Sequence, residues 1–203
     1  MASPKTSDTV LPGKLGYEDF WSLPDDGNRY EIIDGKLYVT PAPAMRHQLV
    51  STRLLLVLHQ HVTSARIGFV FHAPTAVILG PHRQVQPDLL FISREKTKLV
   101  TFKEVDGAPD LAVEIVSPSS KKADRVVKSA AYADSGISWY WIVDPDQRTI
   151  EEYQLENGQY RLIRNWEEPD VFEPRFFPGL TLPLEGLFDW SDFEGLAEGD
   201  AER

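Results

Sequence analysis

An acidic residue inside an apolar strand is the feature that most constrains this chain. Residues 111–116, LAVEIV, surround one acid, Glu114, with apolar and mostly β-forming residues. A short apolar run of this kind is typical of a strand buried on both faces, which requires a sheet covered by other elements. A lone ionised carboxylate there costs several kcal/mol unless it is paired or binds a metal ion. The alternative is a Glu114 at a wet end of the strand, paired with a lysine.

The remaining patterning predicts a mixed α and β fold. Leu54, Leu58 and Val62 recur at helical spacing and indicate a long, buried helix. The dipeptides Asp34-Gly35 and Asn157-Gly158 each separate two runs of β-formers, which predicts two hairpins. We expect helices over 15–23, 44–62 and 119–135, and strands within 29–39, 68–79, 85–93, 110–116, 137–144, 148–166 and 180–182, followed by a weak final helix. This order predicts a central mixed β-sheet flanked by helices, with added β-hairpins.

The domain organisation is expected to be simple. We predict a disordered lead-in over 1–14, a single domain over 15–192 and an acidic tail over 193–203. The first residues have no apolar core, so we expect no signal peptide, and no apolar run is long enough to cross a membrane. The chain has no cysteine, which excludes disulfides, thiolate metal sites and cysteine nucleophiles. These features fit a cytoplasmic protein.

The net charge of −10 argues against a protein that coats nucleic acid through bulk electrostatics, because affinity for phosphates comes mainly from lysine and arginine. It leaves room for a nuclease with a local basic surface. Two clusters in the middle of the chain are more basic, although such runs usually mark a solvated face. The clusters are Arg94, Lys96 and Lys98, and then Lys121, Lys122, Arg125 and Lys128.

A second acid lies next to another apolar strand. Asp88 precedes LLFIS in the segment VQPDLLFIS. Two neighbouring strands with one acid each can direct both carboxylates at one point, and hard cations such as Mg²⁺ bind oxygen ligands of this kind. The helix after Glu114 carries Asp124, Lys128 and Tyr132 on one face, so Lys128 could lean over the end of the strand. The alternatives are an Asp124–Lys128 pair at the surface and a Tyr132 that is simply a core aromatic.

These residues, in this order, resemble a known family. The ordered set is YEIIDGKLYVTPAP, the following His47, QPDLLFIS, DLAVEIVSPSS, the helix with Asp124 and Lys128, and GISWYWIVDP. It is similar to the Uma-two family of restriction endonuclease-like proteins within the PD-(D/E)xK nuclease superfamily, from about Tyr17 to Tyr153. The resemblance implies a restriction-endonuclease-like core and a nuclease activity.

One position departs from the general nuclease pattern. The lysine expected two residues after Glu114 is replaced by Val116, and Lys128 on the next helix is the candidate replacement. The resemblance implies that Asp88 and Glu114, helped by the backbone carbonyl of Ile115, hold Mg²⁺ or Mn²⁺. Lys128 would then lend its charge to the phosphate in the transition state. The possible accessory residues are Glu31, which could instead be a strand-surface acid, His47, which could instead be structural, and Asp124.

Three functions of different classes fit the sequence. The first is a metal-dependent endonuclease that hydrolyses DNA phosphodiester bonds. The second is a non-catalytic interaction or assembly module with a nuclease fold, and the third is a metal-dependent hydrolase of another phosphate ester. Asp88, Glu114 and Lys128 favour the first and third. Cleavage of both DNA strands requires two active sites, so we expect a homodimer.

Overall fold

The computed structural model describes residues 14–118 and 120–191. The expected lead-in and acidic tail lie outside the described residues, apart from Lys14, so these two expectations and the domain boundaries stay predictions. Within the described residues, no helix is both long and apolar enough to cross a membrane.

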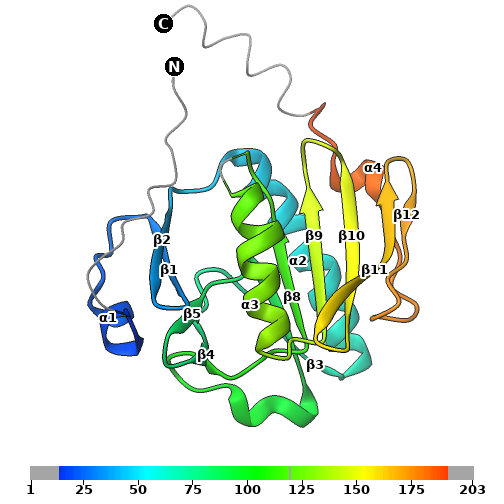
Figure 1. Cartoon of the computed structure of the whole chain (residues 1–203). Coiled ribbons are helices and arrows are strands. Elements are labelled where there is room, and N and C mark those ends of the chain that lie inside the picture. The colour runs from blue at the N-terminus through cyan, green and yellow to red at the C-terminus, as the bar shows by residue number, and fades with distance from the viewer. Residues whose placement is uncertain (1–13, 119, 192–203) are drawn as a thin grey trace, which may run out of the picture.

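A six-stranded mixed sheet forms the centre of the fold (Figure 1). Its strand order is β11-β10-β9-β8-β6-β3, and β8 and β9 are parallel while the other neighbours are antiparallel. The strands are β3 (Gly68–His72), β6 (Leu89–Ser93), β8 (Leu111–Ile115), β9 (Trp139–Asp144), β10 (Thr149–Glu156) and β11 (Gln159–Glu167). The predicted central sheet is confirmed, including the hairpin at Asn157-Gly158.

Helices cover both faces of this sheet, as Figure 1 shows for α2 behind it and α3 in front. Successive strand residues point to opposite faces. Val113 and Ile115 of β8 therefore pack with α2 (Met45–Ala65), whose buried side chains include Leu54 and Leu58. Ala112 and Val116 point to the other face and pack with α3 (Ser129–Asp134), and Glu114 shares that alternation. The sheet geometry thus directs Glu114 at the helix that follows it.

A second sheet of five strands brings the N-terminal hairpin to the same region. Its order is β2-β1-β5-β4-β7. Asp34 and Gly35 both have positive φ, 54° and 81°, as the tight turn between β1 and β2 requires. The strands are β1 (Arg29–Ile33), β2 (Lys36–Thr40), β4 (Val77–Gly80), β5 (Arg83–Val85) and β7 (Val105–Asp106). Strands β5 and β7 are too short to give a periodic signal and were not expected from the sequence.

Smaller elements complete the fold. The early helix is α1 (Tyr17–Ser22), which ends before Pro24 as expected. The short strands β12 (Val171–Phe172) and β13 (Leu182–Pro183) pair with each other and lead to α4 (Leu184–Leu187). The other two helical segments are the 3₁₀ helix η1 (Arg94–Leu99) and the π-helical segment η2 (Ala123–Lys128), which runs directly into α3.

Candidate active site

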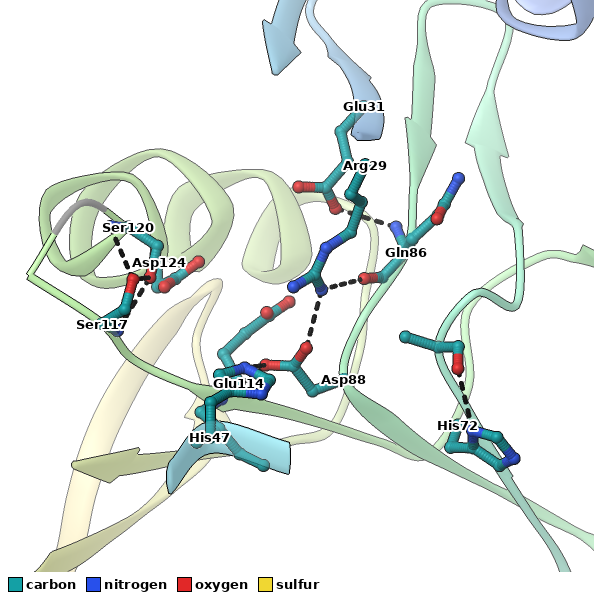
Figure 2. A network of polar contacts seen from close by, with 12 residues as sticks. Arg29, Glu31, His47, His72, Gln86, Asp88, Glu114, Ser117, Ser120 and Asp124 are labelled. Carbon is teal, nitrogen blue, oxygen red and sulfur yellow. Dashed lines mark hydrogen bonds and ion pairs between the residues drawn. The ribbon is translucent and has the colours of Figure 1, made fainter. Parts of the chain in front are cut away.

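Charged side chains from four separate parts of the chain meet at the end of β8 (Figure 2). They line a small, partly open cavity of about 20 Å³, which is room for one water molecule or one ion. The cations and acids that line it are Arg29 and Glu31 from β1, Asp88 just before β6, Glu114 from β8, and Asp124 and Lys128 from η2.

Lys128 lies at the centre of the acidic residues. Its ammonium nitrogen is 2.8 Å from Glu31 Oε2, 3.1 Å from Glu114 Oε2 and 3.5 Å from Asp124 Oδ1. Burial alone would lower the pKa of Lys128, but the negative charges of these carboxylates outweigh burial and raise it. Lys128 is therefore charged and enclosed. The expectation that it reaches the end of the strand is confirmed, and the surface Asp124–Lys128 pair is wrong because both side chains are buried.

Asp88 is held on both oxygens. Its Oδ1 accepts a hydrogen bond from Arg29 Nη1 at 2.7 Å. Its Oδ2 accepts one from the backbone N–H of Ile115 at 2.7 Å and lies 3.1 Å from Nε2 of His47. Burial raises the pKa of Asp88, but the Arg29 charge and the His47 contact outweigh it and keep the pKa well below its ordinary value. Asp88 is therefore an ionised carboxylate with a fixed orientation.

Glu114 is in the opposite electrostatic situation. Burial raises its pKa well above the ordinary value, against the opposing charge of Lys128, and the neighbouring acids Asp124 and Asp88 add to the rise. Its Oε1 accepts a hydrogen bond of 2.6 Å from the hydroxyl of Tyr132. Burial likewise raises the pKa of Asp124. The cavity thus contains carboxylates whose full ionisation is not balanced by the protein.

The wide helical turn of η2 supplies two of these side chains. Asp124 and Lys128 are 2% and 4% exposed, so both point inward from a helix that otherwise meets solvent. Such π-helical turns are rare in proteins overall, and those that do occur are often found at functional sites. The hydroxyl of Tyr140 on β9 also donates to the backbone oxygen of Asp124, at 3.0 Å, and ties this turn to the central sheet.

The donor set fits a divalent metal ion in charge and chemistry. Four carboxylates and two cations line the cavity, which gives a charge of −2 when all six are ionised. Oxygen donors suit hard ions such as Mg²⁺. Within residues 14–118 and 120–191, no group of three or more His, Asp and Glu side chains is arranged to hold a metal. An ion bound by two carboxylates would therefore complete its coordination with water and substrate.

The structure brings the predicted site residues together, and all of them except His47 line the cavity. Asp88, Glu114, Lys128, Glu31 and Asp124 line it, as does Ile115, although a role for the Ile115 carbonyl stays a prediction. Glu31 is 2% exposed, so its alternative as a surface acid is wrong. His47 contacts Asp88 from α2, but it does not line the cavity.

Sequence reasoning missed two residues of this site. Arg29 was not considered, although it lies two positions before Glu31 in a strand, and that spacing places both side chains on one face. Tyr132 was interpreted as a core aromatic. Its ring packs edge-on against that of Tyr140, with 5.4 Å between the ring centroids, but its hydroxyl also donates a hydrogen bond to Glu114.

Comparisons with known proteins agree with the overall fold. A structural neighbour is a crystal structure described as a "putative nuclease belonging to DUF820" from Anabaena variabilis. It has a TM-score of 0.71 and 24% sequence identity, and the match covers 87% of this chain and 98% of that one. At this identity the likeness shows the fold alone. The uncharacterized protein slr1290 of Synechocystis sp. is 23% identical over 165 residues, covering 79% of this chain and 83% of the relative.

A family model identifies the group of proteins to which the chain is related. The model is that of Uma2, described as "Putative restriction endonuclease", and it matches residues 17–185, which is most of the chain. This match contains every residue that lines the cavity, and it supports a nuclease-type function. The chain belongs to the Uma2 family.

Proposed function

We propose that the protein is a metal-dependent endonuclease that hydrolyses DNA phosphodiester bonds at the cavity between β1, β8 and η2. The observation that carries the proposal is the meeting of Asp88 and Glu114 in one cavity whose lining has two more negative than positive charges. A buried charge excess of this kind is costly unless a cation balances it. Membership of the Uma2 family supports the choice of reaction.

The side chains have separate tasks in this proposal. Asp88 and Glu114 would hold Mg²⁺ or Mn²⁺, which supplies concentrated positive charge beside the phosphate and acidifies a water molecule. Arg29, His47 and the Ile115 N–H fix the orientation of Asp88. Tyr132 and Lys128 fix Glu114 in the same way. The protein thus holds its two main oxygen donors rigid before any ligand enters, which avoids reorganisation during the reaction.

The test is cleavage of supercoiled plasmid, single-stranded DNA and RNA with Mg²⁺ or Mn²⁺. We expect the wild type to nick or cut DNA, and Asp88→Asn or Glu114→Gln to lower the rate by about 100-fold or more, in the range found when one main electrostatic group is lost from a site. Asp110→Asn is a matched control, because Asp110 precedes the same strand as Glu114 but bonds Ser93 and Lys96 outside the cavity.

Three results would contradict the proposal. Equal cleavage by the wild type and both site variants would place the activity elsewhere or in a contaminant. Cleavage of RNA alone would change the substrate. No cleavage of any nucleic acid by a folded, metal-loaded protein would favour another phosphate ester or a non-catalytic module.

The oligomeric state is a further part of the proposal. Two copies of the site are needed to cut both strands of a duplex in one binding event, so we propose a homodimer in the DNA-bound state. A mass measured by light scattering with and without duplex DNA tests this. A monomer that cuts duplex DNA on both strands in a single encounter would overturn it.

A further inference from the structure

We propose that Arg29 is the residue that contacts the substrate phosphate, and that Lys128 acts only by positioning the buried carboxylates. This assignment rests on the proposed phosphodiester hydrolysis and deepens it. It reverses the expectation from the sequence, in which Lys128 lends its charge to the phosphate and Arg29 has no part.

Lys128 has no donor left for a substrate. An ammonium group carries three N–H donors, and three carboxylates surround this one at 2.8, 3.1 and 3.5 Å. Its side chain is only 5% exposed, and the carboxylates of Glu31 and Glu114 are 2% exposed. A phosphate that approached Lys128 would have to displace these acids and would meet their charge. The amine therefore holds the cluster together.

Arg29 has hydrogen-bond donors that are free for a ligand, and its side chain is partly exposed to solvent. Its two hydrogen bonds to the protein come from one terminal nitrogen, Nη1, which donates to Asp88 Oδ1 at 2.7 Å and to the Gln86 backbone oxygen at 3.0 Å. Within the residues that the structure describes, the other terminal nitrogen and Nε have no protein partner. The side chain is 15% exposed, more than the other charged groups at the cavity centre. Figure 2 shows its guanidinium group between Gln86, Asp88 and Glu114.

The orientation of this guanidinium suits a phosphate next to Asp88. The two bonds of Nη1 fix the planar group, and a planar guanidinium can present its remaining donors to two oxygens of a phosphate at once. Arg29 pairs with Thr40 across the β1–β2 hairpin, and Thr40 also lines the cavity. A phosphodiester arriving at Asp88 would therefore meet a positive group on a rigid hairpin before it met the enclosed acids.

The experiment measures phosphate binding apart from catalysis. Binding of inorganic phosphate to the Mg²⁺-loaded protein is followed by calorimetry for the wild type, Arg29→Lys and Arg29→Gln, with folding checked by circular dichroism. We expect Arg29→Gln to weaken phosphate binding at least tenfold. Arg29→Lys should weaken it less, because it keeps the charge near Asp88 but loses the planar fork. On an oligonucleotide substrate, KM should rise and kcat should fall in both variants.

A matched control separates this role from a structural one. Arg148→Gln removes another guanidinium, which pairs with Glu168 outside the cavity, and should leave phosphate binding unchanged. If Arg29 only supported the fold, Arg29→Lys would bind phosphate as tightly as the wild type, and the assignment would be wrong. The same holds if the wild type binds no phosphate.

The outcomes also separate this assignment from the proposed function. Phosphate binding that depends on Arg29, without cleavage of any nucleic acid, would keep the assignment and overturn the nuclease. Normal DNA cleavage by Arg29→Gln, with unchanged KM and kcat, would keep the nuclease and overturn the assignment.

Discussion

At the scale of single residues, the pKa values of two carboxyl groups in one cavity are shifted in opposite directions. Asp88 has a cation, an imidazole and a backbone N–H as partners, and its pKa is lowered despite burial. Glu114 has one lysine among several acids, and its pKa is raised, chiefly by burial. Burial raises the pKa of Asp124 in the same way. The cavity therefore contains one acid that is stable as an anion and two whose ionisation opposes folding.

Asp124→Asn should make the metal-free protein more stable at neutral pH, by on the order of 1 kcal/mol. Because the pKa of Asp124 is raised in the folded state, this carboxyl binds more protons in the folded protein than in the unfolded chain between its ordinary pKa of 3.8 and its folded-state pKa. Wild-type stability thus falls as pH rises through the folded-state pKa, and the variant escapes this loss. Urea unfolding in EDTA between pH 4 and pH 8 measures the difference.

The matched control for this variant is Asp134→Asn, on the same helical stretch but exposed and paired with Arg83. It should show no such gain with pH. A variant at position 124 that is less stable than the wild type at every pH would show that the Lys128 contact outweighs the burial of charge.

At the scale of elements, the β1–β2 hairpin matters because β1 carries Arg29 and Glu31 into the cavity. Its turn depends on Gly35, whose φ is +81° and whose Cβ, if present, would lie 2.9 Å from Cβ of Lys14. The β10–β11 hairpin has an equivalent glycine, Gly158, with φ of +79° and open space around it. Similar turns thus support the site in one case and the far edge of the sheet in the other.

Gly35→Ala and Gly158→Ala should each lower the free energy of unfolding by about 1 kcal/mol, because an L side chain is strained at positive φ. Only Gly35→Ala should also weaken phosphate binding and DNA cleavage, since it shifts the strand that carries Arg29. Thermal melts and activity measured on both variants test this pair. Equal loss of activity in the two would show that activity follows overall stability and not the position of β1.

At the scale of the whole molecule, a charge excess at one point should make stability depend on cations. A ligand that binds only the folded state stabilises it by about 2.7 kcal/mol at 100 times its dissociation constant. We therefore expect Mg²⁺ or Mn²⁺ to raise the melting temperature of the wild type by several degrees.

Glu114→Gln removes one of the two proposed ligands and should abolish most of this metal-induced rise. The comparison is made by calorimetric melts at constant ionic strength, with NaCl replacing the divalent salt in the reference sample. An equal rise in the wild type and in Glu114→Gln would mean that the ion acts on the general acidity of the chain, whose net charge is −10.

Much of this organisation could be predicted from the sequence, and the limits have physical causes. The central strands, the two Gly-containing hairpins and the long helix follow from local periodicity and turn chemistry, which act within a few residues. Asp88, Glu114 and Lys128 could be grouped because two neighbouring strands each carry one acid and helical spacing directs Lys128 toward the end of one of them, and the family resemblance supported that grouping. Arg29 could not be assigned, because its partner Asp88 is 59 residues away and their contact depends on how two sheets pack. The short strands β5 and β7 are likewise set by their neighbours.

Glu114 and Asp124, the two acids beside Lys128 whose ionisation opposes folding, also bear on how this protein would respond to artificial selection. A screen for heat resistance alone would reward amides at these positions, because each removes a charge that opposes burial. The selected variants would keep the fold but lose the carboxylates on which the proposed activity depends. A directed-evolution campaign on this scaffold would therefore need to score turnover in every round, and heat-tolerant clones with changes at Glu114 or Asp124 should be the first that it discards.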